Sequence, residues 1–341
     1  MTSKTVSAHK NYPLSVAPMM DWTDRHCRYF HRLLSPGALL YTEMVTTGAI
    51  IHGDADRFLR FNEEEHPVAL QLGGSDPKDL AFAARAGEIK SYDEINLNCG
   101  CPSDRVQSGC FGAVLMRSPE LVAECVKAMR DAVSIPVTVK CRIAIDEEEE
   151  DPFLRRFLEC VCEAGCQKFI IHARKAWLKG LNPKENRDIP PLNYKLVAQM
   201  KQEFPHIEIH LNGGLRDIPD IQEALTKFNG AMIGRAAYQN PRILQKLEEA
   251  QTPHYSPIPD IDIIDAMAKY ATREYNTYGT PVKTVAKHMI GMFQGQAGAR
   301  LWRQSLSPLI PEKFGLNDPG DGTVLLKIYD HVFNNTGRLS A

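Results

Sequence analysis

The chain has 341 residues, of which 40 are Lys or Arg and 42 are Asp or Glu, so its formal net charge is −2. This balance excludes a protein that coats nucleic acid through an overall positive charge, although it allows a local basic surface. Nine cysteines in a chain of this length do not fit a small secreted domain held by disulfides. The N-terminus is polar and long apolar runs are absent, so we expect a cytoplasmic protein without a signal peptide or membrane span.

Short apolar segments alternate with helical patterns along most of the chain. Eight segments predict strands, and they lie at 12–19, 38–43, 67–73, 94–98, 136–142, 168–172, 207–212 and 231–234. Several are continuous apolar runs, which is typical of strands buried on both faces of a parallel sheet. Helices are predicted at 77–90, 119–133, 153–164, 194–204 and 218–227. The acidic run 147–151 predicts a solvated loop.

Eight strands joined by helices predict an α/β fold of the (β/α)8 TIM-barrel type. A doubly wound sheet is the alternative, but the first strand is not followed by the glycine pattern of a dinucleotide-binding turn. Beyond a proline-punctuated stretch at 254–259, only helical periodicity remains. We therefore expect a barrel domain at 1–250 and a small C-terminal helical domain at 260–341.

Polar side chains follow the predicted strands, at the end of a barrel where functional residues collect. Glycines at two of these ends, Gly213-Gly214 and Gly234, allow backbone N–H groups to approach a phosphate closely, and Arg235 adds a positive charge. These residues predict a phosphate site after the last two strands. A simple turn is the alternative interpretation of the glycine pair.

Lys140 lies in a strand that is otherwise apolar or small, so its charge needs a partner. It has three interpretations: it neutralises the negative ring edge of a reduced flavin, forms a Schiff base, or makes an internal ion pair with Glu43. His172 is either a ligand-binding side chain or a core histidine. Gln71 is either a hydrogen-bonding partner for a heterocycle or an ordinary polar residue at a strand end.

The stretch 96–103, NLNCGCPS, continues through glycines to 113 and predicts a mobile loop over the mouth of the barrel. A cysteine thiol held close to a carbanion-like carbon serves as a general acid. In the alternative interpretation, Cys99 and Cys101 bind a metal together with Cys160, Cys162 and Cys166. The spacing of that last group does not match the usual zinc pattern, so we interpret its members as small core residues and expect no metal.

The chain resembles the tRNA-dihydrouridine synthase family, most closely its A-type branch, which acts on D-loop positions 20 and 20a. The resemblance rests on seven motifs in the same order: APMMD at 17–21, QLGG at 71–74, NLNCGCPS at 96–103, VKCR at 139–142, IHAR at 171–174, LNGG at 211–214 and IGRA at 233–236. Each motif is weak alone, whereas seven in order are specific.

The resemblance implies an FMN enzyme that reduces the uridine C5=C6 bond with NADPH. Hydride would pass from the flavin to C6, and Cys101 would protonate C5. The family's flavin contacts map onto Pro18, Met19, Met20, Gln71, Lys140, His172, Asn212, Gly213, Gly214, Gly234 and Arg235. Its tRNA contacts map onto Asn98, which touches the base, and onto Lys184, Arg187, Arg300 and Arg303. Cys99 departs from the family, in which we expect an aliphatic residue.

Regional charge agrees with an RNA partner. Residues 269–303 contain six Lys or Arg and one acid, and residues 174–187 contain five and one. We expect a basic RNA-docking side, a target uridine extruded into the pocket, and a monomer without an obligate protein partner. The alternative functions are a flavin barrel acting on free dihydropyrimidines or dihydroorotate, a lyase using Lys140, and a tRNA-binding protein without catalysis. The alternative interpretation of the two basic regions is an ordinary solvated surface.

Overall fold

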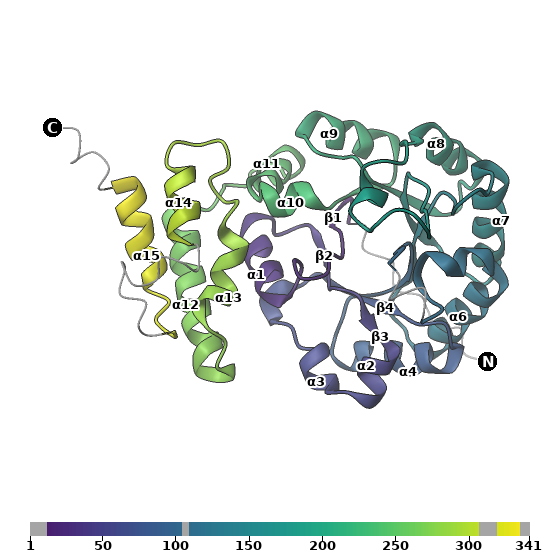
Figure 1. The fold of residues 1–341 in the computed structure, drawn as a ribbon, viewed down its shortest axis with the longest axis horizontal. Coiled ribbons are helices and arrows are strands. Elements are labelled where there is room, and N and C mark those ends of the chain that lie inside the picture. Colours follow the sequence, from purple (N-terminus) through teal and green to yellow (C-terminus); the bar gives the residue numbers. More distant parts are fainter. Residues whose placement is uncertain (1–11, 104–108, 307–318, 335–341) are drawn as a thin grey trace. The chain divides into compact units, whose positions relative to one another are not determined.

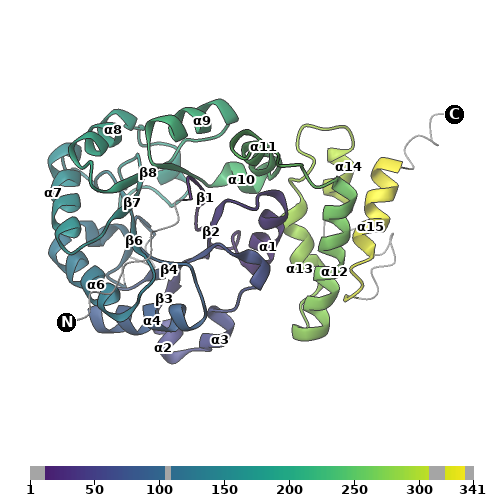
Figure 2. The ribbon, with the colours of Figure 1, turned by 180° about the vertical axis from the view of Figure 1, so that it is seen from behind.

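The computed structural model describes residues 12–103, 109–306 and 319–334. Eight parallel strands form a ring with helices around it (Figures 1 and 2). They are β1 (Leu14–Val16), β2 (Leu39–Tyr41), β4 (Val68–Gly73), β5 (Glu94–Cys99), β6 (Val137–Arg142), β7 (Lys168–His172), β8 (Glu208–Asn212) and β9 (Gly230–Ile233). Each pairs with its neighbour in the chain, β1 pairs with β9 and β2 with β4, so the ring is closed. This closure confirms the (β/α)8 TIM barrel and excludes the doubly wound sheet.

A short additional strand, β3 (Val45–Thr46), was not predicted and continues along β4 after β2 ends. Tyr41 is in register with Ala69 and Val45 with Leu72, so four residue steps oppose three. The extra residue bends the strand as a bulge does. The predicted second strand therefore ends at Tyr41, and Glu43 lies in the interruption, where its carboxylate accepts a hydrogen bond from the backbone N–H of Asp21.

Five helices of the barrel agree closely with the sequence patterns: α4 (Pro77–Ile89), α6 (Pro119–Ala132), α7 (Glu150–Glu163), α8 (Tyr194–Glu203) and α9 (Ile218–Lys227). Two short helices, α2 (Thr47–His52) and α3 (Ala55–Phe58), were not predicted. The side chain of Asp76 caps α4 by accepting hydrogen bonds from two backbone N–H groups. The loop predicted for the acidic run is wrong at its end, because Glu150 and Asp151 form the first turn of α7. Carboxylates are favourable there, at the positive end of the helix dipole.

A second compact unit consists of Trp22–Pro36 together with Arg235–Ala341, while Met1–Asp21 and Gly37–Gly234 form the barrel unit. Its helical segments are α1 (Arg25–Leu34), α10 (Arg235–Gln239), α11 (Arg242–Gln251), α12 (Asp260–Tyr278), α13 (Val282–Ala286), η4 (Lys287–Met289), α14 (Ala299–Ser305), α15 (Val324–Tyr329) and η6 (Asp330–Asn334). The unit thus includes residues 22–36 and 235–250, which the sequence analysis placed in the barrel domain. None of the helices in the described residues is long and apolar enough to cross a membrane.

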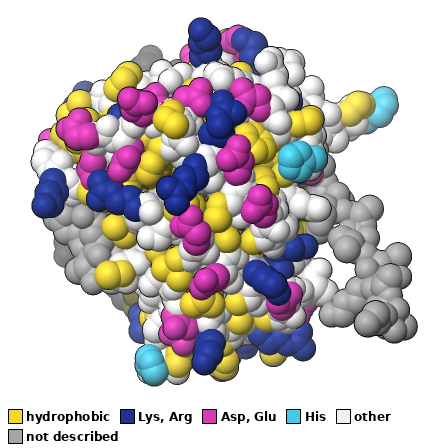
Figure 3. All heavy atoms as spheres, turned by 90° about the vertical axis from the view of Figure 1, so that its right-hand side faces the viewer, with side chains coloured by type: hydrophobic (Ala, Val, Ile, Leu, Met, Phe, Trp, Pro, Cys, Tyr) yellow, Lys and Arg dark blue, Asp and Glu magenta, His cyan; other side chains and the backbone are white. Residues whose placement is uncertain are grey.

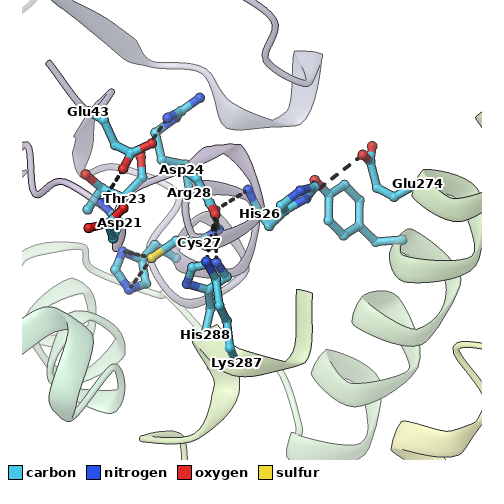
Figure 4. A network of polar contacts seen from close by, with 12 residues as sticks. Asp21, Thr23, Asp24, His26, Cys27, Arg28, Glu43, Glu274, Lys287 and His288 are labelled. Atoms are coloured by element: carbon cyan, nitrogen blue, oxygen red, sulfur yellow. Dashed lines mark hydrogen bonds and ion pairs between the residues drawn. The ribbon is translucent and has the colours of Figure 1, made fainter. Parts of the chain in front are cut away.

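The helix α1 joins this second unit through the polar network drawn in Figure 4. Asp24 caps α1 by accepting from the backbone N–H groups of His26 and Cys27, each at 3.0 Å. Its carboxylate also lies 3.0 Å from Nε2 of His288 and 3.4 Å from Nζ of Lys287. Burial alone would raise the pKa of Asp24, but the hydrogen bond and charge of His288 hold it well below its usual value. The N-terminus of α1 is therefore fixed within the helical unit by a charged side chain.

Candidate active site

The carboxyl ends of β4 to β8 bring together most of the polar residues singled out from the sequence. The sheet register places Asn98 beside Lys140, and His172 between Arg142 and Asn212. Side chains alternate along each strand, so residues two positions apart point to the same side of the sheet. Gln71, Asn98, Lys140, His172 and Asn212 are all mostly buried. These positions form one polar constellation at one end of the barrel, which we name the strand-end site.

Lys140 has an amide partner in this site. Its Nζ donates to Oδ1 of Asn212 at 3.0 Å, and Nδ2 of Asn212 donates to the carbonyl oxygen of Met232 at 2.7 Å. The ion pair with Glu43, one of the three interpretations of Lys140, is not formed in the part of the chain that the structure describes. Burial, followed by the nearby charge of Arg142, lowers the pKa of Lys140 to about 8. A desolvated ammonium whose partner is neutral favours binding of an anionic group.

His172 lies next to a backbone turn that only glycine accommodates. Its Nδ1 is buried and has no hydrogen-bond partner among the described residues. Burial, and then the charges of Arg142 and Lys140, lower the pKa of His172 well below its ordinary value, so the ring is neutral. A Cβ atom on Gly213, which has φ +100°, would lie 3.1 Å from this ring. The orphaned ring nitrogen fits a ligand that supplies a hydrogen-bond partner.

Gly214 is required by its backbone and its surroundings. It has φ +77°, and a Cβ there would lie 2.4 Å from Cδ1 of Leu192 and 2.5 Å from the hydroxyl of Tyr194. That hydroxyl donates to the carbonyl oxygen of Gly213 at 2.6 Å. The glycine pair thus forms a tightly held turn at the end of β8, with backbone close to the strand-end site.

The other predicted cofactor residues follow β1 and β9. Pro18 and Met19 are partly buried, whereas Met20 is 58% exposed. A Cβ on Gly234 would lie 3.5 Å from Sδ of Met19, so the ends of β1 and β9 meet here. Gly234 belongs to the barrel unit, while Arg235 begins α10 in the helical unit.

The backbone around Cys101 is held on both sides. Oδ1 of Asn98 accepts from the backbone N–H groups of Gly100 and Cys101, each at 3.0 Å. Nε of Arg142 donates to the carbonyl oxygen of Gly100 at 3.2 Å, and the N–H of Ala113 donates to that of Cys101 at 2.9 Å. The thiol is partly exposed and lies 3.5 Å from the hydroxyl of Ser103. Residues 104–108 of the predicted mobile loop lie outside the described residues.

Cys99 differs from Cys101 in position and character. It alternates with Asn98 and so points to the other side of β5, where it is fully buried. Burial, and then the neighbouring Cys141, raise its pKa well above the ordinary value, so its thiol is unreactive. Within residues 12–103, 109–306 and 319–334, no three His, Cys, Asp or Glu side chains gather as a metal would require.

Four of the five residues predicted to contact RNA are exposed, two in each unit, whereas Asn98 is 8% exposed. Lys184 and Arg187 lie at the turn η3 (Glu185–Arg187) of the barrel unit. Arg300 and Arg303 are exposed on α14, and they lie on one face of this helix because they are three residues apart. Trp302 of the same helix is buried, and its indole N–H donates to the carbonyl oxygen of Met289 at 2.9 Å.

Counting charges along the sequence overstated the basic surface. Arg174 is 7% exposed and donates to the carbonyl oxygen of Pro190, so it does not add to an exposed patch. Lys269 pairs with Asp265 at 2.6 Å within α12. The barrel face drawn in Figure 3, which lies on the α6 to α8 side, interleaves both signs of charge. The basic contribution therefore rests on fewer side chains than the sequence indicated.

Several polar residues inside the barrel were missed by the sequence analysis. Glu94 and Asn96 precede Asn98 on β5, and Thr138 precedes Lys140 on β6; all three are at most 4% exposed. They could have been found from the polar residues at every second position of β5, because this alternation marks the inward side of a barrel strand. Asn96 accepts a hydrogen bond from Gln71, which in turn accepts one from Asn98.

Comparison with known proteins identifies the family of this chain. A family model described as dihydrouridine synthase (Dus) matches residues 15–313. The tRNA-dihydrouridine(20/20a) synthase of Salmonella typhi is 56% identical over 306 residues, which cover 88% of this chain and 91% of that protein. The protein of the same name from Escherichia coli K12 is 56% identical over 309 residues, covering 90% of this chain and 89% of that protein.

A solved structure of 2-naphthoyl-CoA reductase in complex with 2-naphthoyl-CoA has the same barrel fold, with a TM-score of 0.55 and 11% identity. The match covers 70% of this chain and 50% of that one, and it bears on the fold alone. The family model and the relatives, in contrast, extend over most of this chain and of the relatives themselves. The chain therefore belongs to the dihydrouridine synthase family of enzymes.

Proposed function

We propose that this chain is an FMN-dependent tRNA-dihydrouridine synthase that reduces the C5=C6 bond of D-loop uridines 20 and 20a, with NADPH as reductant. The name of the relatives supports the substrate. The observation that carries the proposal is the strand-end site, where a desolvated lysine, a neutral histidine with an orphaned nitrogen and a glycine turn lie next to the held backbone of Cys101.

These residues fit FMN. Gly213, Gly214 and Gly234 would hold the phosphate through their backbone, with Arg235 as its cation. Lys140 would stabilise the negative edge of the reduced ring, while Gln71 and His172 would hydrogen-bond to it, assisted by Asn212 through Lys140. Pro18, Met19 and Met20 would supply apolar contacts. When bound and reduced, FMN supplies the hydride for C6 of the uracil.

Cys101 then completes the addition across the double bond. Its thiol gives a proton to C5, and the resulting thiolate regains a proton from solvent, so one hydride and one proton are added in each turnover. The hydrogen bonds from the backbone N–H groups of Gly100 and Cys101 to Asn98 fix the position of the Cys101 backbone, from which the thiol extends. Asn98 would also orient the base, because Nδ2 carries a second hydrogen that a uracil carbonyl can accept.

The tRNA would be oriented by exposed cations, Lys184 and Arg187 in the barrel unit and Arg300 and Arg303 in the helical unit. Each would contact phosphates and so contribute affinity rather than base specificity. The target uridine would be extruded from its loop, since RNA loops permit unstacked bases.

The proposal is tested by following bound flavin under anaerobic conditions. Purified protein should be yellow, NADPH should bleach it, and unmodified tRNA should restore the oxidised spectrum, whereas free uridine should not. Cys101→Ala should keep flavin binding and bleaching but lose reoxidation by tRNA, while the matched Cys99→Ala should behave like the wild type. A colourless protein that takes up no FMN contradicts the proposal, as does a Cys101→Ala variant with unchanged turnover.

A further inference from the structure

A chain of hydrogen-bonded side chains crosses the interior of the barrel. Oγ1 of Thr138 donates to Oε1 of Glu94 at 2.7 Å, and Nδ2 of Asn96 donates to Oγ1 of Thr138 at 2.8 Å. Nε2 of Gln71 donates to Oδ1 of Asn96, and Nδ2 of Asn98 donates to Oε1 of Gln71, both at 2.8 Å. All five side chains are at most 8% exposed, so water does not compete for these bonds. We name this chain the amide relay.

The relay has a fixed end and a functional end. Glu94, at the start of β5, forms an ion pair with Nζ of Lys168 at 2.9 Å and accepts from the hydroxyl of Tyr41. Burial, and then the charge of Glu94, raise the pKa of Tyr41 well above its ordinary value, so that hydroxyl remains a donor. At the other end, Oδ1 of Asn98 accepts from the backbone N–H of Cys101.

The direction of every bond follows from the charge of Glu94. A carboxylate only accepts, so the hydroxyl of Thr138 must donate to it and accept from Asn96. Each following amide must likewise donate toward Glu94 and present its oxygen to the next donor. Asn98 is thereby left with its oxygen facing the backbone N–H groups of the cysteine loop.

We infer that Glu94, Thr138 and Asn96 are positioning residues for catalysis, which fix the amide orientation of Asn98 and through it the backbone of Cys101. This inference rests on the proposed function, in which Cys101 protonates the uracil. A reversed Asn98 would set its NH2 group against the N–H groups of Gly100 and Cys101, and the loop would lose both bonds. Such a loss moves the proton donor and turns the amide that would face the uracil, while Glu94, Thr138 and Asn96 themselves are not among the residues that would contact flavin or tRNA.

Thr138→Val tests the inference because it replaces the hydroxyl with a methyl group of similar size. The rate at which tRNA reoxidises the reduced flavin should fall by about tenfold, as expected for loss of one buried hydrogen bond that orients a reacting group. The rate of flavin reduction by NADPH, measured in the same sample, should stay within about twofold of wild type. Thr138→Ser restores the hydroxyl and should restore the reoxidation rate.

Two further variants separate positioning from general stability. Tyr41→Phe removes a bond to the same carboxylate but lies outside the relay, so it should lower the denaturation midpoint and leave the reoxidation rate unchanged. Asn96→Leu breaks the relay one step closer to Asn98 and should reproduce the selective loss, which keeps the test available if Thr138→Val does not fold.

The inference is overturned if the wild type is reoxidised by tRNA and the relay variants are reoxidised equally fast. It is also overturned if Thr138→Ser fails to recover the rate, or if Tyr41→Phe shows the same selective loss. A wild type whose reduced flavin tRNA does not reoxidise would instead contradict the proposed function.

Discussion

Replacing Lys140 by Met should stabilise the flavin-free protein at neutral pH. The ammonium of Lys140 is buried beside Arg142 and has the neutral amide of Asn212 as its partner. Methionine has a similar length and buries without a desolvation penalty. A residue that serves the site at the expense of the fold is a common compromise in enzymes.

The magnitude follows from the lowered pKa. The shift from 10.5 to about 8 corresponds to roughly 3 kcal/mol of unfavourable free energy in the charged form. Loss of the hydrogen bond to Asn212 offsets about 1 kcal/mol, so the variant should gain about 2 kcal/mol at pH 7. Because the folded pKa lies below the unfolded one, the penalty is complete below pH 8 and disappears as the pH rises toward 10.5.

The measurement is urea denaturation of both proteins without flavin, at several pH values from 7 to 10, with a thiol reductant that keeps the cysteines reduced. The difference between the variant and the wild type cancels the titration of other groups. Lys168→Met is the matched control, because Lys168 pairs with Glu94 at 2.9 Å and its removal should destabilise the protein. A Lys140→Met variant that is less stable than the wild type at pH 7, or an advantage that does not change with pH, would refute this reasoning.

Three other predictions concern the turn, the helix cap and the RNA contacts. Gly214→Ala should cost at least about 2 kcal/mol in urea denaturation, because it combines a positive φ with a clash, while Gly180→Ala, with φ +83° and open space, should cost about 1 kcal/mol. Asp24→Ala should cost about 2 kcal/mol at pH 7 through loss of a cap and a charge partner, and the difference should shrink as the pH falls below 3.8, where the unfolded carboxyl takes up its proton. Replacing Arg300 and Arg303 together by Ala should lower tRNA affinity and reduce the slope of log affinity against log salt by about 2.

Local sequence patterns predicted the barrel well because each buried strand is marked by an apolar run within its own segment. The strand at 168–172 and the helix at 218–227 were predicted with their observed bounds. The two-residue strand β3 was missed, since a pattern of period two needs more residues to be recognised. Its presence depends on pairing with β4, which a single segment does not reveal.

Features that depend on distant contacts were beyond local patterns. Residues 25–34 lie within the range predicted as the barrel domain, and their place in the helical unit depends on Asp24 meeting His288 far along the chain. Arg174 counted as a surface cation although the fold buries it. The amide relay likewise depends on the register between β4, β5 and β6, which sets Gln71 opposite Asn96 and Asn96 opposite Thr138.

The central claim is that this chain reduces D-loop uridines of tRNA. Its most direct test is nucleoside mass spectrometry of an unmodified tRNA transcript incubated with the protein, FMN and NADPH, with fragment mapping of the product. The account predicts dihydrouridine, two mass units heavier than uridine, at positions 20 and 20a, and none with Cys101→Ala. Dihydrouridine that is absent with the flavin-loaded wild type, or that forms equally well with Cys101→Ala, would contradict it.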